Sequence, residues 1–299
     1  MYTKILVPLD GSKVAEAVLP YARSLAENLK IPVELMTVID TVAIGRQLGT
    51  EHYMHFDAVI RDQAQSAEQY LNSLVGTFDK ANVSYSVEKG ISAGSILSKA
   101  DADKGTLIAM ATHGRSGLTR WMLGSIAEKV LRAANNPLLL VRATKAAETD
   151  GKATLDSVMV PLDGSALAES VLPYAIELAK ALNLKLRLIR SYHTTGMLFY
   201  YEDYVPSLER VLDTSKFEAM TYLDEKVDHL KYERLSDVSS FVAEGEPAEE
   251  ILDAAKGAPN TLVAMCTHGR SGVNRWMLGS VTEKVVRHTD NPLLVIRAT

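Results

Sequence analysis

The sequence predicts an α/β protein of two similar domains, each with a five-stranded parallel sheet that carries helices on both faces. Short apolar runs alternate with amphipathic segments, the order that gives right-handed crossovers and parallel strands. This pattern occurs twice within 299 residues, a length that suits about two domains. In both copies a glycine-bearing loop joins the fourth strand to the last helix. Ligands of open parallel sheets bind at that edge.

The repeat divides the chain near its middle. Asp10 recurs as Asp163 in the same Val-Pro-Leu-Asp-Gly-Ser motif, and Asn136 recurs as Asn291 in Asn-Pro-Leu-Leu. A polar stretch over 145–154, without apolar periodicity, lies between the copies and reads as a linker. We therefore expect domains at 1–144 and 155–299.

The first copy contains five predicted strands and four predicted helices. The apolar runs that predict strands are Tyr2–Leu9, Val33–Ile39, Val83–Glu88, Thr106–Met110 and Pro137–Val141. Helical spacing of apolar residues predicts helices over 12–29, 58–78, 95–102 and 125–134. Pro20 lies inside the first helix and should kink it, because proline removes one hydrogen bond of the helix. The stretch from Asp40 to Gly49 reads as a loop.

The second copy repeats this order. Its predicted strands are Val158–Leu162, Lys185–Arg190, Ser239–Glu244, Thr261–Met265 and Leu293–Arg297. Its predicted helices are Ala166–Leu182, Leu208–His229, Glu249–Lys256 and Ser280–His288. Pro173 repeats the expected kink.

Composition excludes several classes of partner. The net charge of −5 argues against nucleic acid or an anionic membrane as the main partner. The single cysteine, Cys266, excludes an intrachain disulfide framework and suits a reducing compartment. No leader-like N-terminus and no run of about 18 apolar residues is seen. We expect a cytoplasmic, soluble protein.

The glycine loop has two physical interpretations. Glycines let the backbone approach an anion, and the N–H groups after Gly124 would form a helix N-terminus that binds phosphate. Ser125 and Glu128, like Ser280 and Glu283, also fit a capping box that would satisfy those donors internally. The surrounding glycines favour the phosphate interpretation, and the capping box stays open.

The motifs together carry a resemblance. Pro-x-Asp-Gly-Ser, then Thr-His-Gly followed after nine residues by Gly-Ser, and a closing Asn-Pro-Leu-Leu-x-Val resemble the universal stress protein family. The resemblance covers both copies nearly end to end. It implies a Rossmann-like, adenine nucleotide alpha hydrolase-like fold with strand order 3-2-1-4-5. It also implies association through the fifth strands and, in one branch of the family, an ATP site.

The ATP-binding branch has the pattern Gly-x-x-Gly, nine residues, then Gly and Ser or Thr. Gly114 and Gly124 match it in the first copy, but its first glycine falls on Ala111 here and on Cys266 in the second copy. Cysteine is the larger departure and should crowd a ligand more. We therefore expect both halves to bind and the first half to bind better.

The resemblance carries nucleotide contacts onto matching positions. In the first copy these are Pro8, Leu9, Asp10, Val38, Met110, Ala111, His113, Gly114, Arg115, Gly124, Ser125 and Ile126. In the second copy they are Pro161, Leu162, Asp163, Met265, Cys266, His268, Gly269, Arg270, Gly279, Ser280 and Val281.

Some of these residues have simpler explanations. Asp10 and Asp163 would meet the adenosine end, although Asp-Gly-Ser is also ordinary turn chemistry. His113 and His268 should line the loop rather than catalyse, because no nucleophile stands at a recognisable spacing. Arg115 and Arg270 either neutralise phosphate or are solvated. His52 and His55 lack partners for a metal site, so no metal is expected there.

The expected function is adenine nucleotide binding, ATP with or without Mg²⁺, by a stress-response sensor or adaptor. A slow ATP hydrolase or a nucleotidyl-transfer enzyme is the first alternative, but the lysine-bearing phosphate loop of fast ATPases is missing. A protein that binds no nucleotide, in which duplication serves assembly, is the second. Pairing of the fifth strands, residues 137–141 and 292–296, would make an intrachain pseudo-dimer, and a homodimer stays open.

Overall fold

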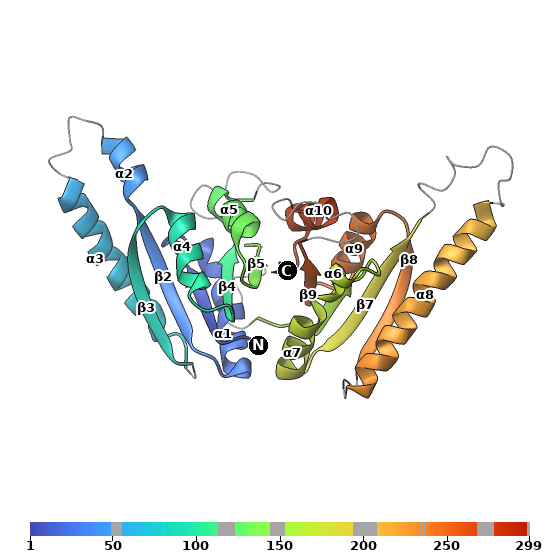
Figure 1. Ribbon diagram of the computed structural model, residues 1–299. Helices are drawn as coiled ribbons and strands as arrows, with labels where there is room; N and C mark the ends of the chain where they lie inside the picture. Colours follow the sequence, from blue (N-terminus) through green and yellow to red (C-terminus); the bar gives the residue numbers. More distant parts are fainter. Residues whose placement is uncertain are drawn as a thin grey trace. The chain divides into compact units, whose positions relative to one another are not determined.

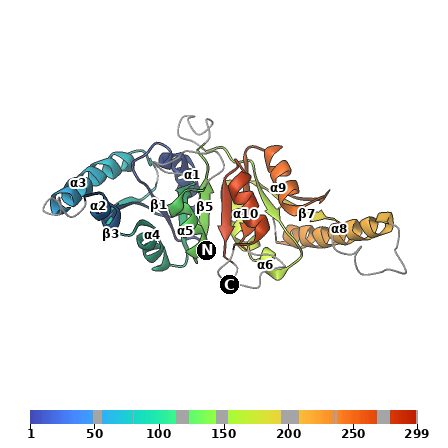
Figure 2. The same ribbon diagram turned by 90° about the horizontal axis from the view of Figure 1, so that it is seen from above.

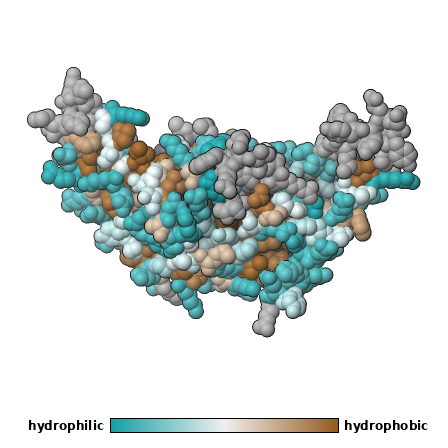
Figure 3. Space-filling model, viewed as in Figure 1, coloured by the Kyte–Doolittle hydropathy of each residue, from teal (hydrophilic) through white to brown (hydrophobic). Residues whose placement is uncertain are grey.

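The chain forms two compact units, Met1–Thr154 and Leu155–Thr299, in a computed structural model. The structure describes residues 1–48, 56–79, 81–112, 123–143, 153–193, 208–233, 235, 237–267 and 278–297. Each unit buries its own hydrophobic core. Within the described ranges, none of the helices combines the length and the apolar character needed to cross a bilayer. Hydrophilic side chains cover most of the face seen in Figure 3, with apolar groups scattered between them.

The sheet of the first unit is parallel and has the expected strand order, β3-β2-β1-β4-β5 (Figure 1). Its strands are β1 (Lys4–Pro8), β2 (Val33–Asp40), β3 (Val83–Gly90), β4 (Thr106–Ala111) and β5 (Leu138–Val141). The register pairs Pro8 with Met36 and Ala111 with Val141. The carboxyl ends of these strands therefore lie at one edge of the sheet, where a ligand site is expected.

Helices cover both faces of this sheet. They are the 3₁₀ helix η1 (Ala15–Val18) and the α-helices α1 (Leu19–Leu29), α2 (Thr41–Leu48), α3 (Phe56–Val75), α4 (Ser92–Asp101) and α5 (Ser125–Ala133). Helices α1 and α3 lie on one face, and α4 and α5 lie together on the other (Figure 2). Because both faces are covered, β4 is buried at all of its positions, which explains its continuous apolar sequence.

The second unit repeats the arrangement, with strand order β10-β9-β6-β7-β8. Its strands are β6 (Ser157–Pro161), β7 (Lys185–Tyr192), β8 (Val238–Glu244), β9 (Thr261–Cys266) and β10 (Leu293–Ile296). Its helices are α6 (Ala166–Glu169), α7 (Leu172–Leu182), α8 (Leu208–Tyr232), α9 (Pro247–Lys256) and α10 (Ser280–His288). Strand β9, like β4, is buried throughout.

The predicted kink at Pro20 is wrong in detail. The first helix is two separate segments, η1 and α1, and Pro20 stands within the first two positions of α1. A proline there costs no hydrogen bond, because the first N–H groups of a helix have no partner inside it. Pro173 stands in the same place at the start of α7. Proline therefore begins the second segment instead of bending one long helix.

The loop expected after the second strand contains a helix. Helix α2 begins at Thr41, and the Asp40 carboxylate accepts a hydrogen bond from the N–H of Ala43 at 2.9 Å, as a cap residue does. Ile44 of this helix is buried in a cluster with Ile39 and Ile60. Packing on α3 therefore stabilises a segment whose sequence reads as a loop.

Candidate functional site

A cavity of about 270 Å³ lies at the carboxyl end of the first sheet. The ends of β1, β2 and β4 form its walls together with the beginnings of η1, α4 and α5. All predicted site residues of the first copy that the structure describes line this cavity: Pro8, Leu9, Asp10, Val38, Met110, Ala111, Gly124, Ser125 and Ile126. The topology thus brings together residues that are far apart in the sequence.

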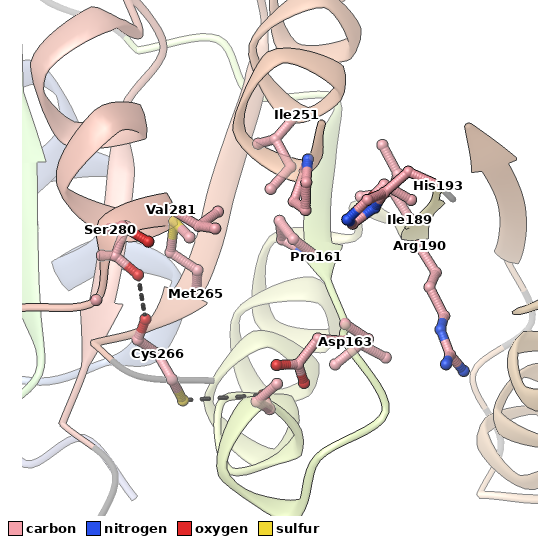
Figure 4. Close-up of a pocket in the computed structure, with 16 residues that line it drawn as sticks. Pro161, Asp163, Ile189, Arg190, His193, Ile251, Met265, Cys266, Ser280 and Val281 are labelled. Carbon is pink, nitrogen blue, oxygen red and sulfur yellow. Dashed lines mark hydrogen bonds between the residues drawn. The ribbon is translucent and has the colours of Figure 1, made fainter. Parts of the chain in front are cut away.

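A cavity of about 290 Å³ occupies the same place in the second unit. Figure 4 shows Met265, Cys266, Ser280 and Val281 on one side and Ile189 on the other. The predicted residues that line it are Pro161, Leu162, Asp163, Met265, Cys266, Gly279, Ser280 and Val281. The two copies therefore present two cavities with a common plan.

Six predicted site residues lie outside the described residues. They are His113, Gly114, Arg115, His268, Gly269 and Arg270. The pair His52 and His55 lies outside them as well. Within the described ranges, no group of three His, Cys, Asp or Glu side chains is placed to hold a metal ion.

The carboxylate of Asp10 organises the turn after β1. Its Oδ1 accepts hydrogen bonds from the Ser12 backbone N–H at 2.9 Å and from the Ser12 hydroxyl at 2.6 Å. Gly11 takes a φ of 80°, which glycine adopts without strain. The second copy repeats both hydrogen bonds at Asp163 and Ser165 with the same lengths. The aspartates thus have the turn role that their motif suggests, and they also line the cavities.

The helix that begins at Ser125 has no capping box. Its N-cap is Gly124, whose carbonyl accepts from the N–H of Glu128 at 2.8 Å, so Ser125 is already the first helical residue. The Glu128 carboxylate accepts hydrogen bonds from Arg132 at 3.1 and 3.2 Å. Gly279 is likewise the N-cap of α10. The capping-box alternative is wrong in both copies.

The first turns of α5 and α10 therefore leave backbone donors at the cavities. The first three residues of α5, Ser125, Ile126 and Ala127, line the first cavity. Within the described residues, their N–H groups have no hydrogen-bond partner. Such groups, with the positive end of the helix dipole, attract anions. The same three positions of α10 line the second cavity.

The strand and the helix beside each cavity are joined directly. The N–H of Gly124 donates to the Thr112 carbonyl at 2.7 Å, and the N–H of Thr112 donates to Val141 at 2.8 Å. In the second unit Gly279 donates to Thr267 at 2.8 Å. These bonds hold the helix N-terminus beside the end of β4 or β9.

The comparison with family models gives one result for both units. The model described as the universal stress protein family matches residues 1–142 and 154–297. The chain belongs to the universal stress protein family.

The relatives of this universal stress protein include one that matches it over nearly the full length of both chains. A universal stress protein of Mycolicibacterium smegmatis is 25% identical over 301 residues, which cover 98% of this chain and 96% of the relative. Universal stress protein MJ0531 of Methanocaldococcus jannaschii is 27% identical over 145 residues, 48% of this chain and 85% of that protein. The crystal structure of a universal stress protein from Archaeoglobus fulgidus has a TM-score of 0.71, with 20% identity, and covers 99% of this chain and 98% of its own. That likeness supports the fold.

This universal stress protein departs from the family pattern at Ala111 and Cys266, and both residues are buried at the ends of their strands. The Cys266 sulfur lies 3.0 Å from the Ser170 hydroxyl and 3.8 Å from the Ala168 carbonyl oxygen. In Figure 4 it points toward α6, away from Ser280. Burial raises the pKa of the Cys266 thiol to about 11. The thiol is thus directed toward α6 and away from Ser280. That Cys266 crowds a ligand, and that the first half binds better, stay predictions.

Each cavity also has a wall that the motifs did not reveal. Ser92 and Ile96 of α4 line the first cavity, and Pro247 and Ile251 of α9 line the second. These helices follow the third strand of their sheet, and their sequences carry no recognisable motif. The strand order could have found them, because helices that follow neighbouring strands begin at the same edge.

Another wall of each cavity is formed at the end of β2 or β7, the second strand of each unit in sequence order, and it differs between the copies. Met36 and Val38 of β2 line the first cavity, whereas Ile189, Ser191 and His193 line the second. Of these, only Val38 was predicted. The first cavity thus has an apolar strand end at the place where the second cavity has a hydroxyl and an imidazole.

Arg190 also lines the second cavity, but its charged group lies outside it. Its guanidinium points away from the cavity in Figure 4 and lies 4.7 Å from the ring centroid of Tyr222. The Tyr222 hydroxyl donates to Glu169 at 2.8 Å, and Lys226 donates to the same carboxylate at 2.7 Å. Burial alone would raise the pKa of Glu169, but these two hydrogen bonds outweigh it and lower the pKa. These contacts among Arg190, Tyr222, Lys226 and Glu169 join β7, α8 and α6 beside the cavity.

Proposed function

We propose that this universal stress protein binds adenine nucleotide, as ATP, in both cavities and acts in the stress response as a sensor or adaptor. One observation carries the proposal: in each unit a strand-end carboxylate and a helix N-terminus whose N-cap is a glycine, without a side-chain cap, line the same largely apolar cavity. Nucleotides need these three elements, an apolar wall for the base, a polar group for the sugar or base edge, and donors for the phosphates.

Each element has a role in this arrangement. The base would pack on the strand-end walls, with Leu9 and Val38 in the first unit. Asp10 would accept hydrogen bonds from the ribose or the base through the carboxylate that also holds the turn. The phosphates would meet the first turn of α5, where Ser125 adds a hydroxyl donor. Mg²⁺, where present, would accompany the phosphates.

The cavities suit binding more directly than chemistry. Their described lining combines apolar side chains with aspartate carboxylates and backbone donors. Such a site can hold an anionic ligand. Pairing of the fifth strands within the chain, and any homodimer, stay predictions, as does slow hydrolysis of ATP.

The test begins with the purified protein. Freshly purified chain is denatured, and the supernatant is assayed for adenine nucleotide; apo protein is then titrated with ATP by calorimetry. We expect one to two nucleotides per chain. Gly124→Glu should abolish binding in the first unit, because it places a carboxylate where the phosphates would lie, and Gly279→Glu should do so in the second.

A matched control is available at Gly76, where an added Cβ atom would meet no atom within 4 Å. Gly76→Glu should leave the ATP stoichiometry unchanged. Full ATP binding in the protein that carries both Gly124→Glu and Gly279→Glu would refute the proposed site. Absence of calorimetric binding in the unaltered protein would refute the function.

A further inference from the structure

Three buried or cavity-side alanines of the first unit are replaced by hydrogen-bonding residues in the second. They stand at the end of the first helical segment, at the end of the fourth strand and in the first turn of the last helix. The pairs are Ala17 and Ser170, Ala111 and Cys266, and Ala127 and Thr282. In the second unit these three residues contact one another through Cys266, and we refer to Ser170, Cys266 and Thr282 as the Cys266 brace.

The Ser170 side chain links Cys266 to α6. Its hydroxyl donates to the Leu167 carbonyl at 2.7 Å. Its Oγ lies 3.0 Å from the Cys266 Sγ, a hydrogen bond in which either atom can be the donor, and the Sγ also lies 3.8 Å from the Ala168 carbonyl oxygen. The thiol is buried and 5% of the residue is exposed, which keeps it protonated. The result is a chain of two hydrogen bonds from the end of β9 to α6.

Thr282 adds the link on the other side. Its hydroxyl donates to the backbone carbonyl of Cys266 at 2.7 Å, and the side chain is buried. Thr282 is the third residue of α10, so this bond ties the first turn of that helix to the end of β9. Helix α10 would hold the phosphates, and the end of β9 would contact the rest of the nucleotide.

At the equivalent positions of the first unit the side chains are alanine methyl groups, which cannot form these hydrogen bonds. Both units share the bond from the glycine before the last helix to the threonine after the fourth strand. The Cys266 brace therefore fixes the distance between strand end and helix start more firmly in the second unit than in the first.

We propose that the Cys266 brace preorganises the second cavity, so that it binds ATP about tenfold more tightly than the first. This inference rests on the proposed function. A cavity whose walls are fixed in advance loses less conformational freedom when a ligand binds, and the saved cost appears as affinity. Ser170, Cys266 and Thr282 are positioning residues in this account. The order of affinities is the reverse of the one that side-chain size at Cys266 suggests.

The test measures each cavity alone in the full chain. The Gly124→Glu protein retains only the second cavity, and the Gly279→Glu protein retains only the first. ATP titrations should give a dissociation constant about tenfold lower for the Gly124→Glu protein. Adding Ser170→Ala, Cys266→Ala and Thr282→Ala to it should raise the constant to that of the first cavity. These alanines copy the first unit, so the fold is expected to tolerate them, and the unfolding midpoint checks it.

Two further variants separate positioning from simple folding support. Cys266→Ser keeps a donor to Ser170 and should retain the affinity that Cys266→Ala loses. The reciprocal graft, Ala17→Ser with Ala111→Cys and Ala127→Thr in the Gly279→Glu protein, should tighten ATP binding at the first cavity.

The outcomes distinguish the two proposals. Equal ATP affinity in the two single-cavity proteins, a tighter first cavity, or an alanine triple with unchanged affinity would overturn the brace and leave nucleotide binding intact. Absence of ATP binding in both single-cavity proteins and in the unaltered protein would overturn both proposals.

Discussion

Val38 and Ser191 stand at equivalent places in the two cavities, yet one is apolar and the other carries a hydroxyl. Ser191 stands near the end of β7, and His193, which directly follows that strand, lines the same cavity. The first unit has Asp40 there, and its carboxylate accepts hydrogen bonds from the first turn of α2 at 2.9 Å and from the Ser92 hydroxyl at 3.2 Å. An apolar wall buries a base without reading its edge, whereas a hydroxyl and an imidazole can form hydrogen bonds to it.

Base selectivity should therefore differ between the cavities. In the Gly124→Glu protein, Ser191→Val should change the ratio of ATP affinity to GTP affinity about fivefold to tenfold, since one hydrogen bond to the base edge is lost. Calorimetric titration with both nucleotides measures the ratio. Val38→Ser in the Gly279→Glu protein is the reciprocal control and should change the ratio in the opposite direction. Ratios that stay the same in both proteins would contradict this prediction.

At the scale of elements, Glu34 joins strands and a helix on one face of the first sheet. Its carboxylate accepts hydrogen bonds from Lys4 of β1 at 2.9 Å and from Ser86 of β3 at 3.1 Å, and it forms an ion pair with Lys99 of α4 at 2.9 Å. Lys99 also reaches Glu88 at 3.3 Å. Burial alone would raise the pKa of Glu34, but the hydrogen bonds from Lys4 and Lys99 outweigh it and lower the pKa.

The lowered pKa predicts how stability depends on pH. A carboxyl group whose pKa is depressed by folding stabilises the protein above its unfolded pKa, and this contribution is lost as the pH falls through the folded value. Glu34→Gln should cost about 1–2 kcal/mol at neutral pH and make the first unit less sensitive to acid. Urea unfolding between about pH 7 and pH 3 measures both effects. Glu68→Gln, at an exposed position of α3, is the control, and an equal acid response in the two variants would disprove the role of Glu34.

Local sequence signals predicted most elements and missed those that depend on packing. Apolar runs predicted the ten strands that the described residues form, and α10 begins and ends where helical spacing places it. Helix α2 was missed because Gly45 disfavours a helix by about 1 kcal/mol, and the compensating contacts come from α3. The change from η1 to α1 was predicted as a kink at Pro20 in one long helix, because the apolar periodicity continues across both segments.

The candidate site divides in the same way. Residues in motifs, such as Asp10 and Gly124, could be predicted because turn and helix-start chemistry is local. Ile96 and Ile251 could not, since they look like ordinary apolar positions of an amphipathic helix. The hydrogen bonds of Cys266 were also beyond sequence reasoning, because they join segments 96 and 16 residues apart.

At the scale of the whole molecule, the duplication places one cavity in each of two compact units. Each unit contains a cavity and a buried core, so a bound nucleotide should protect the unit that holds it. At a hundredfold excess of ATP over the dissociation constant, the gain is about 2.7 kcal/mol. In the Gly124→Glu protein, hydrogen exchange should slow with ATP in Ser280–His288 and stay unchanged in Ser125–Ala133. Equal protection of both helices in that protein would contradict independent stabilisation.

The bond between the Gly124 amide and the Thr112 carbonyl also bears on engineering and on divergence within the family. It closes the chain at the point where one segment leaves β4 and returns to α5, and Gly279 and Thr267 do the same in the second unit. The intervening segment can therefore change in composition without displacing the elements that border the cavity. Because each unit has its own bond of this kind, the segment of one unit can be exchanged while the other unit stays unchanged, which gives protein engineering a defined place to start.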